Sequence, residues 1–488
     1  MARAYEPELF YPTALPSLPD LMTTWGYTPR QIEDHEDKFA YILHLVTTLP
    51  HLLPSENGYA SLHFDNLVRM LGARYARPFL DQLIDAGIIE CDGRYSKSRK
   101  SFGYRICAVH HSRTVACLTM GTTLRKKLIA RHESEQRQLV SGTILSRMHQ
   151  DLQQLRVRYE EARLENQQVY DATHAFLVQH RARLDTTTLV PADYRALLVE
   201  AQPLPGVRLK TLKAMRKSAR SQRCTDTKFG TRTTLFSILA RMCLDRLDGN
   251  ANLLRKIHER RIPQPSRPVA GSRIYSVVTS LSSWLRPYLY RAREEHQALY
   301  NLDISNSQPF LLSILLREKY GTQLPADAQR YIDLTCAGTF YKTIAGAMGE
   351  PYATKLEQKA FKEMFFASIF FCETLHTRNS RAGAYFREHF PVVTALIEQH
   401  KSPRYQALAI RMQQVEAEII VDTVAAALQR KRIWCATIHD SIVCLAQDKD
   451  EVLQRTQDAF RAAYELTPAV SVEKLEPEDQ PSSHAQAA

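Results

Sequence analysis

The pattern of hydrophobic and polar positions changes several times along the chain, and each change predicts a boundary. Residues 1–35 are rich in Pro, Tyr and Thr and predict an irregular arm, whereas residues 36–54 are apolar at helical spacing. Residues 121–200 follow a helical period but are highly charged, which predicts a long solvated helical hairpin. After the Pro-rich connector Pro263–Pro268 the chain is apolar until near residue 472, and Glu476–Ala488 has the composition of a disordered tail.

A compact alternation of helical and strand patterns lies between residues 60 and 106. It predicts two helices and then a hairpin: helices Ser61–Leu71 and Ala76–Ala86, and strands Ile88–Cys91 and Gly103–Ile106. This order resembles a winged helix-turn-helix module, whose wing would carry Arg94, Lys97, Arg99, Lys100 and Arg105. Such a wing commonly meets nucleic-acid phosphates. The alternative is a module of the same shape that only packs or contacts another protein.

Composition limits the classes of protein to which the chain can belong. The length of 488 residues predicts roughly two to four domains, and 44% hydrophobic with 24% charged residues is typical of a soluble globular protein. The nine cysteines are scattered without a CxxC pair, which excludes a disulfide framework and a cysteine zinc site. The Pro-rich, acidic segment Met1–Asp20 is unlike a signal peptide, and no stretch predicts a membrane span. We therefore expect a cytoplasmic protein with no membrane partner.

The net charge of +12 indicates a polyanionic partner, although a solvated cationic surface gives the same value. Positive charge is concentrated in residues 205–232, where Asp226 is the one acid among nine basic residues. A segment of this kind can follow a phosphate backbone, and a plain solvated face is the alternative.

Two aspartates far apart in the sequence stand at the ends of predicted strands. Ala298–Ile304 has the pattern of a short strand that carries Asp303 near its end. Trp434–Ile438 and Ser441–Ala446 have the pattern of two strands joined by the tight turn His439-Asp440. Carboxylates that converge in space can hold two divalent ions, which clamp the attacking and leaving oxygens of a phosphoryl transfer. The pair therefore indicates nucleotidyl transfer.

The segments around these aspartates resemble the motifs of family A DNA polymerases. Asp303-x-Ser305-x-x-Gln308 is similar to motif A, and His439-Asp440-Ser441 is similar to motif C. Gln358-x-x-x-Lys362-x-x-x-Phe366-x-x-x-Phe370 is similar to motif B. Three flanking segments also resemble the family: Gly271-Ser272-Arg273-Ile274, Tyr385-Phe386 through Phe390-Pro391, and Met412-Gln413 with Glu418-Ile419-Ile420. All six stand in the family's order over about residues 270–450.

The resemblance implies an α+β fold of the right-hand polymerase type. The palm would hold an antiparallel sheet, and the rest of the chain would be largely helical. The implied order is an N-terminal arm and winged-helix-like module (1–120), a helical, thumb-like region (121–260), palm with motif A (261–335), fingers with motif B (336–400), palm with motif C (401–474) and a disordered tail (475–488).

The resemblance also implies roles for residues of this chain. Asp303, Asp440 and the backbone carbonyl of Ile304 would hold two Mg²⁺ ions, for which Mn²⁺ could substitute. The nucleotide would be bound by Lys362, Phe366, Phe370, Gln308, Asn306, Gln358 and Tyr341. The primer and template would be bound by Arg273, Gln413, His439 and Arg286. Lys362, Phe366 and Phe370 would share one helix face, although core packing is the ordinary role of phenylalanines at this spacing.

Several positions depart from the family pattern. The motif B arginine is Gln358, so one triphosphate contact is absent or comes from Lys355 or Lys359. The Tyr-Gly of motif B is Phe370-Phe371. The glutamate of motif C is Ser441, which resembles the related phage-type single-subunit RNA polymerases.

The choice between dNTPs and rNTPs depends on two of these positions. The DNA polymerases of the family have a glutamate that blocks a ribose 2′-hydroxyl where this chain has Gln308, which is of nearly the same size. The RNA polymerases have a small residue there, and they use a tyrosine hydroxyl at the position of Phe370, which cannot hydrogen-bond a ribose. Both positions favour dNTPs.

We therefore expect a template-directed DNA polymerase that adds dNTPs to a primer 3′ end and suits a mobile element. No acidic set resembling a 3′–5′ exonuclease precedes the palm, so we expect no proofreading. A DNA primer-template would be its partner, and the N-terminal module would contact a replication partner protein. One alternative is a single-subunit RNA polymerase, or a polymerase that copies RNA or needs no template. A second is a DNA-binding replication protein without catalysis.

Overall fold

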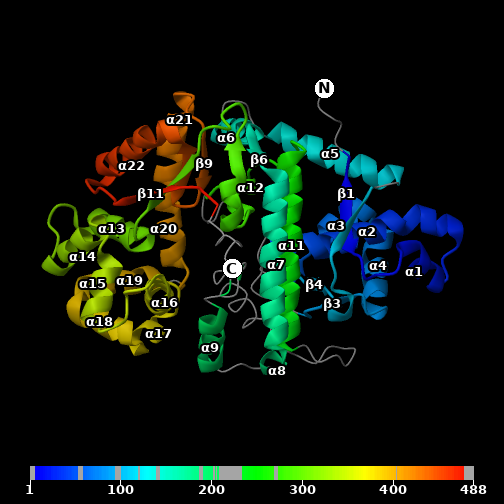
Figure 1. Ribbon diagram of the computed structural model, residues 1–488, viewed down its shortest axis with the longest axis horizontal. Helices are drawn as coiled ribbons and strands as arrows, with labels where there is room; N and C mark the ends of the chain where they lie inside the picture. The colour runs from blue at the N-terminus through cyan, green and yellow to red at the C-terminus, as the bar shows by residue number, and fades with distance from the viewer. Residues whose placement is uncertain are drawn as a thin grey trace, which may run out of the picture. The chain divides into compact units, whose positions relative to one another are not determined.

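The computed structural model describes residues 6–52, 59–93, 101–118, 121–138, 143–185, 191–201, 204, 206–207, 234–268, 273–402 and 404–477. Over these residues the protein is a mostly helical α+β structure with antiparallel sheets, as the sequence predicts. It divides into two compact units, one from residues up to 138 and 159–255, the other from 139–158 and 256–478 (Figure 1). No helix in these ranges is long and apolar enough to cross a bilayer.

Small antiparallel sheets and short helices open the first unit. The elements are β1 (Glu8–Pro12), α1 (Leu18–Thr24), α2 (Pro29–Leu52), β2 (Ala60–Ser61), α3 (Phe64–Leu71), α4 (Ala73–Asp85), β3 (Ile89–Cys91), β4 (Gly103–Ile106), η1 (Ala108–His110) and β5 (Thr114–Leu118). β1 pairs with β5, and β2, β4 and β3 form a three-stranded sheet in that order. The helix–helix–hairpin order predicted for residues 60–106 is confirmed.

The prediction of an irregular arm over residues 1–35 is wrong, because β1, α1 and the start of α2 lie there. The side chain of Ser17 accepts a hydrogen bond from the backbone N–H of Asp20, and a proline stands in the first turn of α1. An N-cap serine followed by proline is a local signal for a helix start. Leu18 and Met22 of α1 are buried in the core of this unit, and this burial holds the segment in place.

The rest of the first unit is helical: α5 (Thr122–Gln138), α7 (Tyr159–Gln179), α8 (Arg181–Leu184), α9 (Pro191–Ala201) and α11 (Leu235–His258), whose last residues belong to the second unit. α7 packs on α11 through buried amides. Asn166 Nδ2 donates to the carbonyl of Leu247 at 2.9 Å, and Asn250 Nδ2 donates to Asn166 Oδ1 at 3.0 Å. The prediction of a solvated hairpin within residues 121–200 is therefore wrong, because α7 buries one face against a helix from outside that range.

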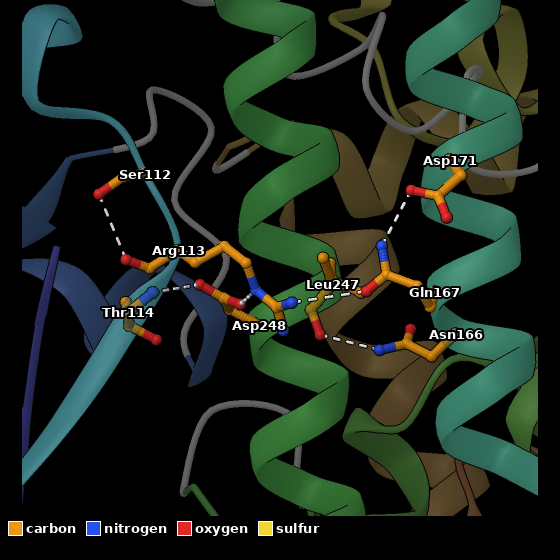
Figure 2. A network of polar contacts seen from close by, with 8 residues as sticks. All are labelled: Ser112, Arg113, Thr114, Asn166, Gln167, Asp171, Leu247 and Asp248. Atoms are coloured by element: carbon orange, nitrogen blue, oxygen red, sulfur yellow. Dashed lines mark hydrogen bonds and ion pairs between the residues drawn. The ribbon is translucent and has the colours of Figure 1, made fainter. Parts of the chain in front are cut away.

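A polar network joins the loop before β5 and the start of that strand to α7 and α11 (Figure 2). Asp248 of α11 accepts a hydrogen bond from the backbone N–H of Thr114 at 2.8 Å and lies 3.5 Å from Arg113 Nε. Arg113 Nη1 also reaches Gln167 Oε1 of α7 at 3.5 Å. Burial raises the pKa of Asp248, while the Thr114 N–H and Arg113 favour its ionised form. The network fixes the β1–β5 ribbon against the helical pair.

The second unit contains the largest sheet of the described residues. Its strands are β6 (Leu155–Val157), β7 (Leu289–Arg291), β8 (Leu299–Ile304), β9 (Cys435–Ile438), β10 (Ser441–Leu445) and β11 (Val470–Lys474). The antiparallel order is β11-β8-β10-β9, and β6 pairs separately with β7. The predicted strand at Asp303 and the predicted hairpin around His439-Asp440 are therefore confirmed.

Helices precede, separate and follow these strands in the sequence. The α-helices are α6 (Ile144–Gln153), α12 (Val277–Ser280), α13 (Ser307–Tyr320), α14 (Ala326–Cys336), α15 (Phe340–Ala347), α16 (Lys355–Phe365), α17 (Thr374–Asn379), α18 (Arg381–His389), α19 (Pro391–Lys401), α20 (Ala407–Ala417), α21 (Ala426–Arg430) and α22 (Lys449–Tyr464). The other helical segments are η2 (Ser283–Tyr288), η3 (Phe366–Phe370), η4 (Glu418–Ala425) and η5 (Ala446–Asp448). Of these, η3 and η4 are π-helical.

Alternation along β8 separates a core face from a polar face. Leu302 and Ile304 are buried, and Asp303 between them is only half-buried. Because neighbouring residues of a strand point to opposite faces, Asp303 is directed away from the face of those two side chains. α22 packs against β8 and β10, and its Phe460 meets Phe310 of α13 with ring centroids 5.3 Å apart. Helix α22 therefore supports strands β8 and β10 of the sheet.

Candidate active site

The sheet brings Asp303 and Asp440 to neighbouring positions. In the β8–β10 pair Asp303 lies opposite Ser441, and Ser441 lies opposite Ile438 in the β9–β10 hairpin. Asp440 is the turn residue directly before Ser441, so it stands beside the strand position of Asp303. The two carboxylates interact, because the charge of Asp440 raises the pKa of Asp303. Two acids far apart in the sequence thus share one place in the fold.

The electrostatic surroundings of Asp303 suit a bound cation. Burial raises the pKa of Asp303 from 3.8 to about 7; the charges of Asp440, Glu473 and Glu416 act in the same direction, and Lys362 opposes them. A cation would stabilise the ionised form that burial and repulsion disfavour. In the described ranges no three His, Cys, Asp or Glu side chains form a metal cluster. Two carboxylates fit Mg²⁺, which commonly takes one or two protein carboxylates together with substrate phosphates and water.

Buried polar atoms without partners surround the aspartates in the sequence and in the sheet. Those without a hydrogen-bond partner among the described residues include Asn301 Oδ1, Asn306 Nδ2, Ser307 Oγ, Gln308 Oε1, Tyr341 OH and His439 Nδ1. A buried polar atom left unpaired costs about 1–3 kcal/mol, so such groups normally have a partner. Four of these atoms belong to side chains that the resemblance places at the nucleotide or the primer. Their number here indicates a site that binds a polar ligand.

Helix α16 presents Lys362 toward this region. A capping box fixes the start of the helix: Glu357 N–H donates to Thr354 Oγ1 at 3.2 Å, and Thr354 N–H donates to Glu357 Oε2 at 2.8 Å. Lys362 Nζ lies 5.4 Å from the centroid of the Tyr341 ring, and its charge lowers the pKa of Asp303. Gln358, one turn earlier, donates to the carbonyl of Tyr352 at 3.3 Å. Lys362 is therefore the residue of this helix whose positive charge acts on Asp303.

Phe370 lies deeper in the protein than Lys362 and Phe366. The helix continues from α16 into the π-helical segment η3, in which each turn takes about one more residue. A spacing of four still brings Phe366 and Phe370 together, and the place of Phe370 at the nucleotide stays a prediction. Phe370 is fully buried, with ring centroids 5.8 Å from both Phe365 and Phe366, whereas Phe366 stays half-buried and lies 6.1 Å from the Tyr341 ring. Phe370 belongs to the core and supports Phe366.

His439 occupies a strained position in the β9–β10 turn. Its φ is +57°, a value that costs free energy for a residue other than glycine and is frequent at functional sites. Burial lowers the pKa of His439, and the charges of Arg273 and Arg286 lower it further, so the ring is neutral at pH 7. Its ring meets that of Tyr275, which is exposed, at a centroid distance of 5.8 Å. The sequence did not single out Tyr275.

The other residues expected at the primer, Arg273, Gln413 and Arg286, differ in their contacts and in their burial. Arg273 forms two hydrogen bonds to Glu416, and Gln413 is half-buried on the same helix, α20. Arg286 is mostly buried, and its Nε donates to the carbonyl of Val278 at 3.1 Å. Burial lowers the pKa of Arg286. Glu416 was missed in the sequence, although an acid at the apolar spacing of Met412, Val415 and Ile419 is a signal that could have found it.

Little of the predicted basic surface can be placed. Arg94, Lys97, Arg99 and Lys100 of the wing, and nearly all of the basic segment 205–232, lie outside the described residues, as do Gly271-Ser272 and most of the tail 475–488. Arg105 is described and does not extend from a wing. It is a buried residue that is ion-paired with Glu90, and its guanidinium lies 4.5 Å from the Tyr59 ring centroid. Its assignment to the phosphate-binding wing is wrong, because β4 turns its side chain into the unit.

Among the comparisons with known proteins, only the one with solved structures finds a match. No protein-family model and no curated protein matches the chain. Among solved structures, the chain is similar to one described as "POL domain of Pol1 from M. smegmatis complex with DNA primer-template and dNTP", with 15% identity and a TM-score of 0.43, over 72% of this chain and 73% of that chain. That match is to the POL domain of a family A DNA polymerase, the family that the motifs resemble. A TM-score below 0.5 supports no conclusion about activity, so the proposed function depends on the residues of the chain itself.

Proposed function

We propose that the protein is a template-directed DNA polymerase that adds dNTPs to a primer 3′ end and does not proofread. The observation that carries this proposal is the convergence of Asp303 on β8 and Asp440 in the turn before β10, with the charge of Lys362 acting on Asp303. Two carboxylates beside a cation and several unpaired polar atoms suit a magnesium-bound triphosphate. A protein that only bound DNA would gain nothing from two neighbouring, half-buried acids, because they repel a polyanion.

The parts of a right-hand polymerase would be distributed along the chain as the motifs suggest. The palm would comprise residues 261–335 and 401–474, and the fingers residues 336–400; all of these belong to the second unit. The thumb-like region would comprise residues 121–260, although residues 139–158 and 256–260 of that range belong to the second unit. The N-terminal module, residues 1–120, would contact DNA or a replication partner protein.

Each residue at the aspartates would have a distinct task in the reaction. Asp303, Asp440 and the carbonyl of Ile304 would hold Mg²⁺, which when bound supplies charge neutralisation for the phosphoryl transfer. Lys362 would bind the triphosphate as a point charge, and the unpaired atoms of Asn306 and Tyr341 would orient the nucleotide.

The primer terminus would be held beside these groups. The neutral ring of His439 would bind near the last phosphate of the primer, while Gln413 and Arg273 would meet the minor-groove edge of the last base pair. Hydrogen bonds at that edge depend little on sequence. Arg286 would add positive charge on the primer side, as its effect on the pKa of His439 indicates.

Gln308 would exclude ribonucleotides. Its side-chain oxygen is buried with no hydrogen-bond partner in the described part of the chain, at the start of α13 and five residues after Asp303. A 2′-hydroxyl near it would meet a side chain nearly as large as glutamate. Phe370, as a buried phenylalanine, offers no hydroxyl to a ribose in exchange.

The proposal is tested by extension of a labelled primer on a DNA template with Mg²⁺, with dNTPs compared with rNTPs. We expect template-directed extension with dNTPs that Asp303→Ala and Asp440→Ala each abolish. The matched control is Asp458→Ala, a mostly exposed carboxylate on α22, which should retain activity. Extension with rNTPs alone would make the protein an RNA polymerase. DNA binding without synthesis on DNA or RNA templates would refute the catalytic function.

A further inference from the structure

Arg273 and Glu416 form an ion pair with two hydrogen bonds, and the charge of Glu416 acts on Asp303. Arg273 Nε donates to Glu416 Oε1 at 2.6 Å, and Nη2 donates to Oε2 at 2.5 Å. The side chain of Glu416 is completely buried, and that of Arg273 is 16% exposed. This is a bidentate arrangement, which fixes the plane of the guanidinium as well as its position.

Burial in this pair is unfavourable for the ionised carboxylate of Glu416. Burial raises the pKa of Glu416 to about 7, even though Arg273 acts to lower it. Apolar residues of similar volume in place of such a pair often make a protein no less stable. Packing therefore does not explain why a carboxylate stands at this position of α20.

The pair also lies close enough to the proposed site of reaction for their charges to interact. The charge of Asp440 raises the pKa of Glu416, and the charge of Arg273 lowers that of His439, so both partners lie within electrostatic reach of the β9–β10 turn. The two bonds to Glu416 use two of the five N–H groups of the guanidinium. The other three form no hydrogen bond to any described residue, so acceptors outside the protein could meet them in the plane that Glu416 sets.

We propose that Glu416 is a positioning residue that orients Arg273 toward the minor-groove acceptors of the primer-terminal base pair. The inference rests on the proposed polymerase function and adds to it a residue that no motif assigns. Purine N3 and pyrimidine O2 stand at equivalent places in every base pair, so a guanidinium held in one orientation can test base-pair geometry without reading sequence. Without Glu416 the guanidinium would rotate and lose that alignment while keeping its charge.

The test combines a change in the protein with a change of one DNA atom. Primer extension is measured on a normal primer ending in a purine and on one whose terminal purine carries carbon in place of N3. Loss of one hydrogen bond from a charged donor lowers the rate on the order of 10–100-fold, and we expect this penalty for the unmodified protein. We expect almost no penalty in Arg273→Ala, and a penalty below about threefold in Glu416→Gln, with the KM for dNTP unchanged.

A matched control separates orientation from the general effect of removing a carboxylate. Arg378 and Glu398 form a second bidentate pair, with N–O distances of 2.9 and 2.8 Å, outside the proposed site. Glu398→Gln should keep the full penalty of the modified primer. Should Glu416→Gln fail to fold, Arg273→Lys keeps the charge and loses the planar fork, and we expect it to lose the penalty as well.

The outcomes distinguish this inference from the proposed function. If the unmodified protein extends primers with the penalty and Glu416→Gln keeps it in full, Glu416 does not position Arg273 and only the inference fails; where Glu416→Gln does not fold, a full penalty in Arg273→Lys has the same meaning. The same holds if the unmodified protein extends both primers equally. If the unmodified protein extends no primer, the polymerase proposal fails and the inference with it.

Discussion

Replacing Asp303 by asparagine should abolish synthesis and at the same time stabilise the protein. Asparagine has nearly the same shape but carries no charge, so it removes both the cost of burying a carboxylate and the repulsion from Asp440. The folded-state pKa of Asp303 is raised from 3.8 to about 7, so the unfolded chain releases this proton first. The contribution of Asp303 to stability therefore falls as pH rises from about 4 to about 7 and stays low above that range.

The magnitude follows from the shift. A difference of about three pKa units, at about 1.4 kcal/mol each, corresponds to about 4 kcal/mol at alkaline pH. Near pH 5 the stability difference reflects only the interval between the unfolded-state pKa and that pH, which corresponds to about 2 kcal/mol. In a unit of this size 1 kcal/mol shifts the melting temperature by about 2–4 °C, so Asp303→Asn should melt roughly 8–16 °C higher at about pH 8.5.

The assay is thermal and urea unfolding with EDTA at about pH 5 and about pH 8.5, and then with Mg²⁺ at the higher pH. Mg²⁺ should raise the melting temperature of the unmodified protein and have less effect on Asp303→Asn, because one carboxylate ligand is gone. Glu388→Gln removes one exposed carboxylate from α18 and is the control; we expect no pH-dependent gain from it. A stability difference between Asp303→Asn and the unmodified protein that is equal at both pH values would refute the reasoning. So would equal stabilisation of the two by Mg²⁺.

Three further predictions concern the neighbouring residues. Lys362→Ala should raise the KM for dNTP and lower kcat/KM on the order of 10–100-fold, because a charge-assisted contact to the triphosphate is lost. Lys359→Ala is the control and should change neither value; equal effects of the two substitutions in steady-state kinetics would show that Lys362 is not the triphosphate ligand. Gln308→Gly should reduce the preference for dNTPs over rNTPs, measured as the ratio of their kcat/KM values, and an unchanged ratio would exclude Gln308 as the barrier to ribose. Phe370→Ala should lower the free energy of unfolding by about 3–5 kcal/mol, because it leaves a cavity in a closed core. Phe366→Ala should destabilise the protein less and raise the KM for dNTP more. A larger loss of stability in Phe366→Ala than in Phe370→Ala, measured by urea unfolding, would contradict the core position of Phe370.

Much of the local structure around the site could be predicted because its signals are local. The turn His439-Asp440 lies between two short apolar runs, and both strands of that hairpin occur as expected. The strand that carries Asp303 has an apolar pattern of its own and was predicted nearly to its ends. These elements depend on residues that are neighbours in the sequence, so one sequence contains the information needed to recognise them.

Other features depend on contacts between distant segments, and the sequence could not show them. The helical spacing of Lys362, Phe366 and Phe370 predicted one face, but only the tertiary packing decides that Phe370 is fully buried while Phe366 stays half-buried. The pattern of residues 121–200 predicted a hairpin, yet burial of Asn166 against α11 decided the partner of α7.

The aspartates show the same division. Their residue types and turn context were evident in the sequence, and so was the kind of chemistry they suit. Only the register of β8 between β10 and β11 places Asp303 opposite Ser441 and beside Asp440, and only the packing of α20 brings the carboxylate of Glu416 to Arg273. Hydrophobic periodicity determines which segments become strands and helices. The tertiary structure decides which charges meet, because burial and long-range pairing set the desolvation and repulsion that each charge experiences.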